Sequence, residues 1–270
     1  MTDSTSTEHD RATVAERAAR AGGDLALESF RAGIAVDRKS SKTDVVTQAD
    51  RDSQEKASAV VAESHPEEPI VGEEGDELKA VPEEGAAWVI DPIDGTNNYV
   101  RGLRTWATSV AATMDGEPVA AANVMPALGD SYLADGEHAR LNGDPVGVSD
   151  RTDPEAATVA VTAWSGTTRP EAYTRLTSEL VSEFGDLRRF GCAQATLSFV
   201  ASGALDALFT NVDPNPWDTL AGVGLIRRAG GRVTDLDGDR WDGSGGFVAS
   251  NGVSEIHRTA LDAARTIRDE

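Results

Sequence analysis

Cysteine, lysine and aromatic residues are scarce in this chain of 270 residues. Cys192 is the only cysteine, so no disulfide can form within the chain and a reducing compartment is expected. Only four of the 25 basic residues are lysines, and the 46 acidic residues leave a net charge of −21. Nucleic acid and anionic membranes both need concentrated positive charge, so we expect neither as the main partner.

Long apolar runs are also absent. No stretch reaches 18 consecutive apolar residues, and the polar start MTDSTSTEHD is not a signal peptide, so we expect a soluble, cytoplasmic protein. The large excess of acid with few lysines is typical of proteins from salt-loving organisms, where high ionic strength screens the repulsion. The 39% hydrophobic content is enough for a substantial core, which argues against disorder.

The order of the sequence patterns predicts one domain over residues 11–270, after a disordered tail at 1–10. In the first half, to about residue 150, apolar residues at helical spacing predict helices up to Phe30 and from about 50 to 63. Asp-Gly at 115–116 and 135–136 and Asn-Gly at 142–143 then predict the hairpins of an antiparallel meander. The second half, about 151–270, alternates strands with helices, so we expect an α+β half followed by an α/β half.

The segment WVIDPIDGTNN, residues 88–98, places two carboxylates where a buried strand should end. Trp88 to Ile90 is a short apolar run, and Pro92 and Gly95 stop it. Asp91 and Asp94 therefore lie at a strand exit, the place where α/β proteins bind ligands. A strand closed by a simple Asp-Gly turn is the alternative, but the spacing predicts a site for a hard cation.

Three further acids lie in comparable settings. Glu73 follows the short apolar run IVG, where a solvated turn is the alternative interpretation. Asp218 lies at the mouth of an apolar helix and Asp50 at the start of another, so each could simply be an N-cap. Spacing alone leaves these alternatives open.

Together the segments resemble the inositol monophosphatase superfamily of Mg²⁺-dependent, lithium-sensitive phosphatases. The resemblance covers nearly the whole chain and rests on DVVTQAD (44–50), GEE (72–74), WVIDPIDGTNNYVRG (88–102), GCAQATLSFVASGALDA (191–207) and WDTLAGVGLIRRAGG (217–231). It implies a layered α-β-α-β-α sandwich. It also implies hydrolysis of a small sugar or polyol phosphate, namely inositol monophosphate, fructose 1,6-bisphosphate or both, as in archaeal relatives.

The resemblance also implies a set of metal ligands and catalytic residues. Glu73, Asp91 and the carbonyl of Ile93 would hold one Mg²⁺, and Asp91, Asp94 and Asp218 the second, with two or three ions per active site. Oxygen ligands suit Mg²⁺, and a shared carboxylate would hold two ions close together. Thr96, with Glu73 and Asp50, would orient the attacking water.

The resemblance assigns the substrate side less completely. Gly95 and Thr96 would contribute backbone N–H groups to a phosphate cradle, and Lys39 resembles an active-site loop lysine. Gly191, Cys192 and Ala193 fall where relatives contact the inositol ring, although Cys192 replaces a threonine. Thr210 stands where inositol-selective relatives carry a glutamate, which weakens the case for inositol.

Other functions were weighed against this one. DLDGDRWDGSGG at 235–246 has Arg240 and Gly246 where a calcium-binding EF-hand loop needs glycine and glutamate, so it predicts a hairpin turn. No Walker A motif, dinucleotide fingerprint or HExxH zinc motif is present. A 3′-phosphoadenosine nucleotide phosphatase and a non-enzymatic acidic metal-binding protein remain as alternatives. We also expect a homodimer.

Overall fold

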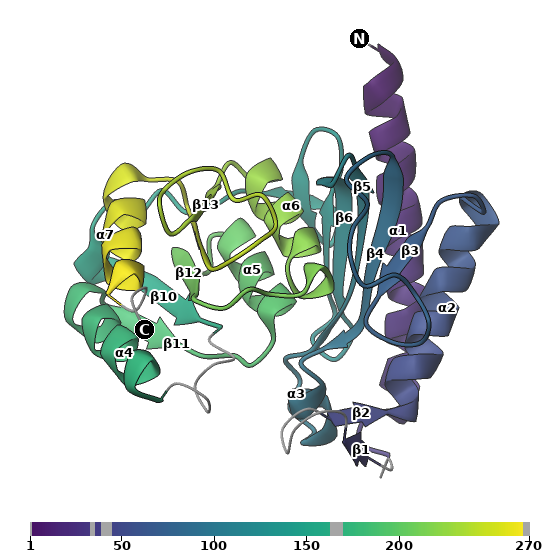
Figure 1. The fold of residues 1–270 in the computed structure, drawn as a ribbon, viewed down its shortest axis with the longest axis horizontal. Helices are drawn as coiled ribbons and strands as arrows, with labels where there is room; N and C mark the ends of the chain where they lie inside the picture. Colours follow the sequence, from purple (N-terminus) through teal and green to yellow (C-terminus); the bar gives the residue numbers. More distant parts are fainter. Residues whose placement is uncertain (1, 33–35, 39–44, 163–169, 267–270) are drawn as a thin grey trace.

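Helical and sheet layers alternate along the long axis of the molecule (Figure 1). The structure, a computed structural model, describes residues 2–32, 36–38, 45–162 and 170–266. Helices α1 (Thr2–Ser29) and α2 (Gln48–Ser64) form the outer layer on one side, next to a seven-stranded sheet. Helices α5 (Ala193–Ala201) and α6 (Leu220–Arg228) separate that sheet from a five-stranded one, which α4 (Pro170–Glu183) and α7 (Ser254–Arg265) cover. The predicted α-β-α-β-α sandwich is therefore confirmed.

The larger sheet is the predicted meander with one additional parallel edge strand. Its strands run in the order of the sequence and pair antiparallel, except that β3 pairs parallel with β4. Their bounds are β3 (Ile70–Gly72), β4 (Ala86–Asp94), β5 (Ala107–Met114), β6 (Glu117–Met125), β7 (Asp130–Ala134), β8 (Ala139–Leu141) and β9 (Asp144–Val146).

Two of the three predicted hairpin turns have the expected two-residue form. Asp115 and Asn142 have φ of 51° and 52° and each precedes a glycine of positive φ, the arrangement that such turns require. The third is longer, because Asp135 accepts hydrogen bonds from the backbone N–H groups of Glu137 and His138 and forms a four-residue loop between β7 and β8.

Helix α1 begins earlier than the sequence predicts. Residues 2–10, expected to be a tail, belong to α1. Glu8 forms an ion pair with Arg228 of α6, with 3.8 Å between Oε2 and Nη2, which places this part of the helix beside the folded chain. All nine residues from 2 to 10 are polar and carry no apolar periodicity, so the pattern could not predict this part of the helix.

The smaller sheet has the strand order β11-β10-β12-β14-β13. Strands β10 (Thr158–Val161), β12 (Ala207–Thr210), β13 (Arg232–Asp235) and β14 (Phe247–Ser250) agree with the predicted segments, whereas β11 (Asp186–Arg188) was missed. It is only three residues long and contains two charged side chains, so it has no apolar pattern. The 235–246 segment forms the predicted turn, since Asp235 accepts from the N–H groups of Asp237, Gly238 and Asp239.

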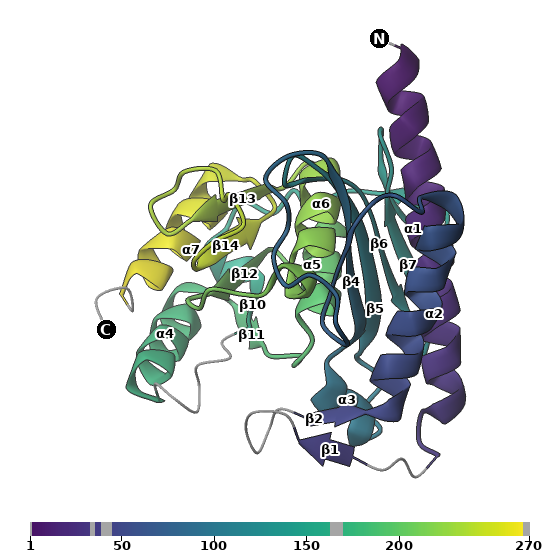
Figure 2. The same ribbon diagram turned by 45° about the vertical axis from the view of Figure 1, so that its right-hand side comes forward.

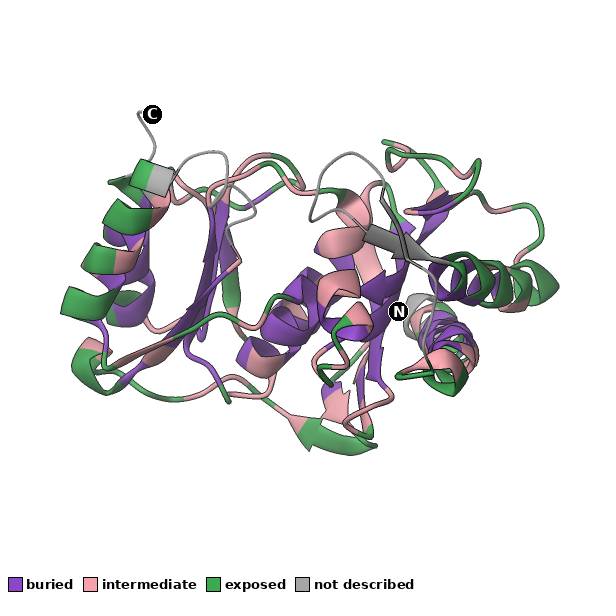
Figure 3. Cartoon of the chain, turned by 90° about the horizontal axis from the view of Figure 1, so that it is seen from below, coloured by how far each residue is buried: buried purple, intermediate pink, exposed green. Residues whose placement is uncertain are grey.

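Buried residues lie on the sides of the layers that face one another (Figure 3), and their apolar side chains form clusters between the layers. One cluster unites α1, α2 and the outer face of the large sheet, and another packs α4 and α7 on the small sheet. The central cluster contains residues of both halves, from Val71 to Ala249. Side chains alternate between faces along a strand, so Trp88 and Ile90 of β4 face α1 and α2 while Val89 faces the central helices.

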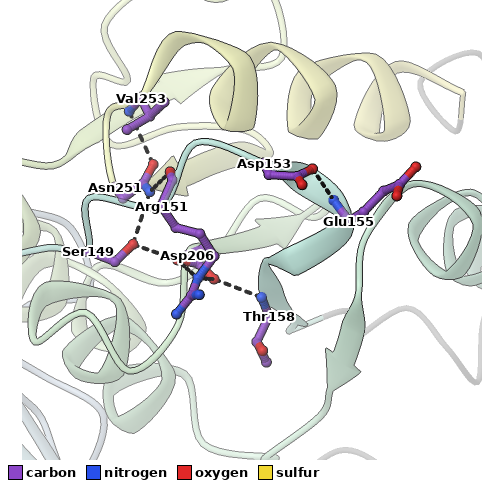
Figure 4. A network of polar contacts seen from close by, with 8 residues as sticks. All are labelled: Ser149, Arg151, Asp153, Glu155, Thr158, Asp206, Asn251 and Val253. Atoms are coloured by element: carbon purple, nitrogen blue, oxygen red, sulfur yellow. Dashed lines mark hydrogen bonds and ion pairs between the residues drawn. The ribbon is translucent and has the colours of Figure 1, made fainter.

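A buried carboxylate joins three segments at one end of the small sheet (Figure 4). Asp206 is 2% exposed and accepts hydrogen bonds from Ser149 Oγ, Arg151 Nε and the N–H of Thr158. Asn251, after β14, donates to Ser149 Oγ and to the carbonyl of Arg151. The described donors thus satisfy this carboxylate within the protein.

The short sheet β1 (Val36–Arg38) and β2 (Val45–Thr47) lies beside α3 (Thr96–Val100) in both ribbon views (Figures 1 and 2). Lys39 lies outside the described residues. Among the described helices, none has both the length and the apolar character needed to cross a membrane.

Candidate active site

Strand β4 ends in a distortion that presents both of its acids at one place. Asp91 pairs with Ser109 of β5, and the next registered pair is Asp94 with Ala107, so Pro92 and Ile93 form an irregularity between them. The carbonyl of Pro92 accepts from Ser53 Oγ and Thr108 Oγ1 instead of from a strand partner. Such a bulge redirects side chains, and it places two acids three residues apart on the side of the central layer.

The pairing of β3 with β4 places Glu73 at the end of β4, near Asp91. Strand β3 runs parallel to β4 with Gly72 opposite Ile90, so the next residue, Glu73, lies at the level of Asp91. The loop is braced by Gln54 of α2, which accepts from the N–H of Glu74 and donates to its carbonyl. A Cβ on Gly72 would lie 2.6 Å from Gln54 Nε2, so this close approach requires glycine.

Asp218 comes from the other half of the chain. It ends the 3₁₀ turn η3 (Pro216–Asp218) just before α6. Asn215 fixes it twice, by donating Nδ2 to Asp218 Oδ2 at 3.1 Å and by accepting the Asp218 N–H at 3.1 Å. The turn places this carboxylate opposite the end of β4 rather than using it as a cap for α6.

The three carboxylates of Asp91, Asp94 and Asp218 converge. Each offers an oxygen, and these oxygens lie within 4.8 Å of one another. Asp91 is 1% exposed, and its Oδ1 has no hydrogen-bond partner among the residues that the structure describes. A buried carboxylate oxygen without a donor is costly, so its position indicates that a cation belongs there.

Burial, together with mutual repulsion, raises the pKa values of the cluster. Burial raises the pKa of Asp91 well above its ordinary range, and the charges of Glu73 and Asp94 raise it further. Burial raises the pKa of Asp218 to about 8, with contributions from Asp94 and Glu73. Asp91 and Asp218 therefore hold their charge at neutral pH only at a free-energy cost, which a divalent cation would remove.

Asp94 differs because the N-terminus of α5 faces it. Burial raises its pKa to about 6, against the lowering effects of the Cys192 thiol and the N–H groups of Gln194 and Ala193. Cys192 Sγ donates to Asp94 Oδ2 at 3.1 Å, and the Gln194 N–H donates to the same oxygen at 2.5 Å. A helix N-terminus favours a carboxylate, so α5 orients Asp94 and leaves its other oxygen toward the cluster.

Thr96 stands beside the acids with its hydroxyl already oriented. Its Oγ1 is 3.2 Å from Asp50 Oδ1 and 3.0 Å from the carbonyl of Ile93. Asp50, 1% exposed, lies in the first turn of α2, and Gly95 precedes α3 with φ of 86°. That left-handed conformation turns the chain sharply after Asp94, and a Cβ on Gly95 would lie 3.0 Å from Cys192 Cβ.

The other predicted residues divide between the site and its surroundings. Gly191, Cys192 and Ala193 form the entry to α5 beside Asp94, and Cys192 and Ala193 both contact that carboxylate. Thr210 is buried at the end of β12, and its Oγ1 accepts from the N–H of Val212 at 3.4 Å. No described contact joins Thr210 to the acids, so a contact with substrate remains a prediction for it.

Three residues around the site were missed by sequence reasoning. Gln54 and Gln194 brace the segments that carry Glu73, Asp94 and Asp218. Lys79 Nζ donates to the carbonyls of Gly72 and Glu73 at 2.7 and 3.1 Å and lies 5.7 Å from the Trp217 ring centroid. Gln54 and Gln194 act through partners at least 20 residues away in the sequence, and Lys79 acts on backbone carbonyls, so residue types and spacing alone do not mark their roles.

The donor set fits Mg²⁺. All converging groups are oxygens, the acids outnumber the nearby cations, and no described histidine joins the cluster. Hard cations with octahedral shells prefer such ligands and complete the shell with water or substrate phosphate.

Comparisons with known proteins place the chain in a family. The model of the inositol monophosphatase family matches residues 8–268. This chain belongs to that family. Nus factor SuhB of Escherichia coli K12 is 32% identical over 266 residues, covering 97% of both chains, and Nus factor SuhB of Pseudomonas aeruginosa is 34% identical over 239 residues, covering 83% and 85%.

A solved inositol monophosphatase of Thermotoga maritima has a TM-score of 0.85 and 28% identity, covering 96% of this chain and 98% of that one. That of Anabaena has a TM-score of 0.82 and 26% identity, covering 94% and 95%. Membership in the family supports a Mg²⁺-dependent phosphatase of the inositol monophosphatase type.

Proposed function

We propose that this protein is a phosphomonoesterase that hydrolyses a small sugar or polyol phosphate by attack of water. The observation that carries the proposal is the convergence of Asp91, Asp94 and Asp218 within 4.8 Å, with one buried oxygen of Asp91 lacking a described hydrogen-bond donor. Beside it, the Thr96 hydroxyl is paired with Asp50.

In this mechanism Glu73, Asp91 and the carbonyl of Ile93 would hold one Mg²⁺, and Asp91, Asp94 and Asp218 would hold a second. When bound, the ions supply Lewis-acid polarisation of the phosphate and make water a better nucleophile at neutral pH. The Thr96 hydroxyl donates its hydrogen bond to Asp50, which leaves the lone pairs of Oγ1 free to accept a hydrogen bond from the attacking water. Thr96 and Glu73 thereby orient this water toward phosphorus.

Three classes of phosphate ester are the candidate substrates. Inositol monophosphates and fructose 1,6-bisphosphate both place a phosphate on a compact polyol, so the acidic cluster alone does not separate them. A 3′-phosphoadenosine nucleotide needs an adenine platform in addition. Lys39, the N–H groups of Gly95 and Thr96, Gly191 to Ala193 and Thr210 are the proposed substrate contacts.

A phosphate-release screen tests the proposal. The full-length protein is incubated with Mg²⁺ and each of the three substrate classes, and then with excess EDTA. We expect release from at least one sugar or polyol phosphate and none after chelation. The matched variants are Asp91→Asn, in the cluster, and Asp239→Asn, in the exposed turn after β13. Activity that survives EDTA, or that persists in Asp91→Asn, would contradict the metal mechanism.

A second candidate function comes from the relatives named Nus factor SuhB, which match 97% of both chains at 32% identity. A factor that acts by binding another protein would need the fold but not the metal cluster. Asp91→Asn separates the two functions, because it removes hydrolysis while leaving the outer helical surfaces intact. With a net charge of −21, such binding would involve a basic partner surface rather than nucleic acid.

A further inference from the structure

Gln194 links the two halves of the acidic cluster. It is fully buried in the first turn of α5, where its backbone N–H donates to Asp94 Oδ2 at 2.5 Å. Its side-chain Nε2 extends to the other half and donates to the carbonyl of Trp217 at 2.6 Å. Trp217 directly precedes Asp218. Gln194 therefore binds the carboxylate of Asp94 and, at the same time, the backbone next to Asp218.

The side-chain oxygen of Gln194 also accepts hydrogen bonds. Its Oε1 accepts from the N–H of Gly222 at 2.8 Å and from Asn123 Nδ2 at 3.0 Å. Gly222 is the third residue of α6, and its N–H has no partner within the helix. Since Thr219 makes no described side-chain cap at this helix, Gln194 caps α6 from outside and fixes the helix that follows Asp218.

The packing of α5 against α6 holds the amide in this orientation. A Cβ on Gly222 would lie 2.3 Å from Leu197 Cβ, so the two helices approach as closely as glycine permits. Asn123 of β6 is also fixed, since it accepts from Ser109 and donates to Ser198 Oγ at 2.9 Å. A buried network whose members are all paired is rigid, because any displacement leaves a buried polar group unpaired.

We propose that Gln194 is a positioning residue that sets the affinity of Asp91, Asp94 and Asp218 for their divalent cation. This inference rests on the proposed metal site. The acids repel one another, so the segments that carry them would separate without a restraint. Gln194 supplies that restraint by joining the Asp94 side to the Trp217–Asp218 turn. Groups that orient metal ligands in this way typically contribute 10- to 100-fold to metal affinity.

Calorimetric titration of the metal-free, full-length protein with Mg²⁺ tests the proposal directly. Gln194→Met keeps the length of the side chain and removes both polar ends. Gln194→Asn keeps a buried amide for Asn123 but is one methylene too short to reach the Trp217 carbonyl. If Gln194→Met does not fold, the Mg²⁺ affinity of Gln194→Asn tests the proposal instead. We expect Mg²⁺ affinity at the cluster to weaken by about tenfold or more in either variant.

Ser198→Ala is the matched control. Ser198 is fully buried one turn further along α5 and belongs to the same polar network, but the described bonds of its hydroxyl reach only Asn123 and the carbonyl of Gln194. We expect it to lower the melting temperature while leaving the Mg²⁺ dissociation constant within about twofold of the wild type. This separates metal positioning from a general loss of stability.

The other outcomes are distinct. If both Gln194 variants bind Mg²⁺ as the wild type does, while Asp91→Asn does not, the positioning role is wrong and the metal site stands. If Ser198→Ala weakens binding as much as Gln194→Met, the effect is one of general stability and the proposal fails. If Asp91→Asn binds as the wild type does, the metal site and this inference fail together.

Discussion

Two buried carboxylates show opposite solutions to the same physical problem. Asp206 is 2% exposed and is paired with an arginine, a hydroxyl and a backbone N–H, so its charge is balanced by the protein (Figure 4). Asp91 is 1% exposed, but the groups around it are other carboxylates. The first arrangement stabilises the fold on its own, whereas the second is complete only with a cation. Burial of an acid therefore indicates function only when its neighbours fail to neutralise it.

The largest expected effect on activity comes from replacing the buried carboxylates of Asp91 and Asp206, one at a time, by the uncharged amide of asparagine. Asp91→Asn should lower phosphatase activity by more than about 10³-fold, because Lewis-acid stabilisation of the transition state is worth several kcal/mol. Asp206→Asn should leave the rate per folded molecule within about twofold. Steady-state kinetics on both proteins checks the comparison. Equal losses in the two variants would mean that activity follows stability alone.

A smaller loss of activity is expected when Thr96 is changed, because its hydroxyl orients water and does not bind the metal. Thr96→Ala should lower kcat by about 10²-fold with little change in KM, because water orientation acts mainly in the transition state. Thr96→Ser keeps the hydroxyl near Asp50 and should recover most of the rate. Saturation kinetics on the three proteins measures this, and identical rates for the Ala and Ser variants would exclude a role for the hydroxyl.

The comparison also explains what the sequence could predict. Asp91 and Asp94 were predicted because their apolar strand and turn are local signals, and the family resemblance extended the prediction to Glu73 and Asp218. The sequence could not reveal that the register of β3 and β4 places Glu73 beside Asp91, since parallel pairing depends on distant residues. Gln194 was missed for the same reason. Within an apolar helix a glutamine carries no signal until its partners are known.

For the fold, too, elements marked by local sequence signals were predicted, and elements that depend on long-range pairing were not. The meander and the alternating half were predicted from turn dipeptides and apolar periodicity, and the structure has both. The parallel edge strand β3 and the short charged β11 depend on long-range pairing. The start of α1 at Thr2 was missed because its first residues carry no periodic apolar face.

A third prediction concerns stability rather than rate. Asp206→Ala leaves the Thr158 N–H and the Ser149 hydroxyl without their acceptor, so we expect a loss of about 1–3 kcal/mol in the free energy of unfolding. Arg151 is half exposed and can be solvated, so it should add little. Urea unfolding at fixed Mg²⁺ measures the loss. The increase in melting temperature on adding Mg²⁺ should equal that of the wild type, and a smaller increase would place Asp206 in the metal site.

The smallest and most specific prediction is a pH dependence of the metal-free protein. Burial raises the pKa of Asp94 from 3.8 to about 6 and that of Asp218 from 3.8 to about 8, so the folded state binds more protons than the unfolded state between the ordinary and the raised value of each group. The unfolding free energy should therefore fall as pH rises from about 4 to about 8, with only the Asp218 contribution remaining above about pH 6. Asp218→Asn should flatten the slope, and saturating Mg²⁺ should do so in the wild type, because the bound cation keeps the acids ionised. Asp206→Asn should leave the slope unchanged. A slope that persists in Asp218→Asn would show that the acids elsewhere on the surface cause it.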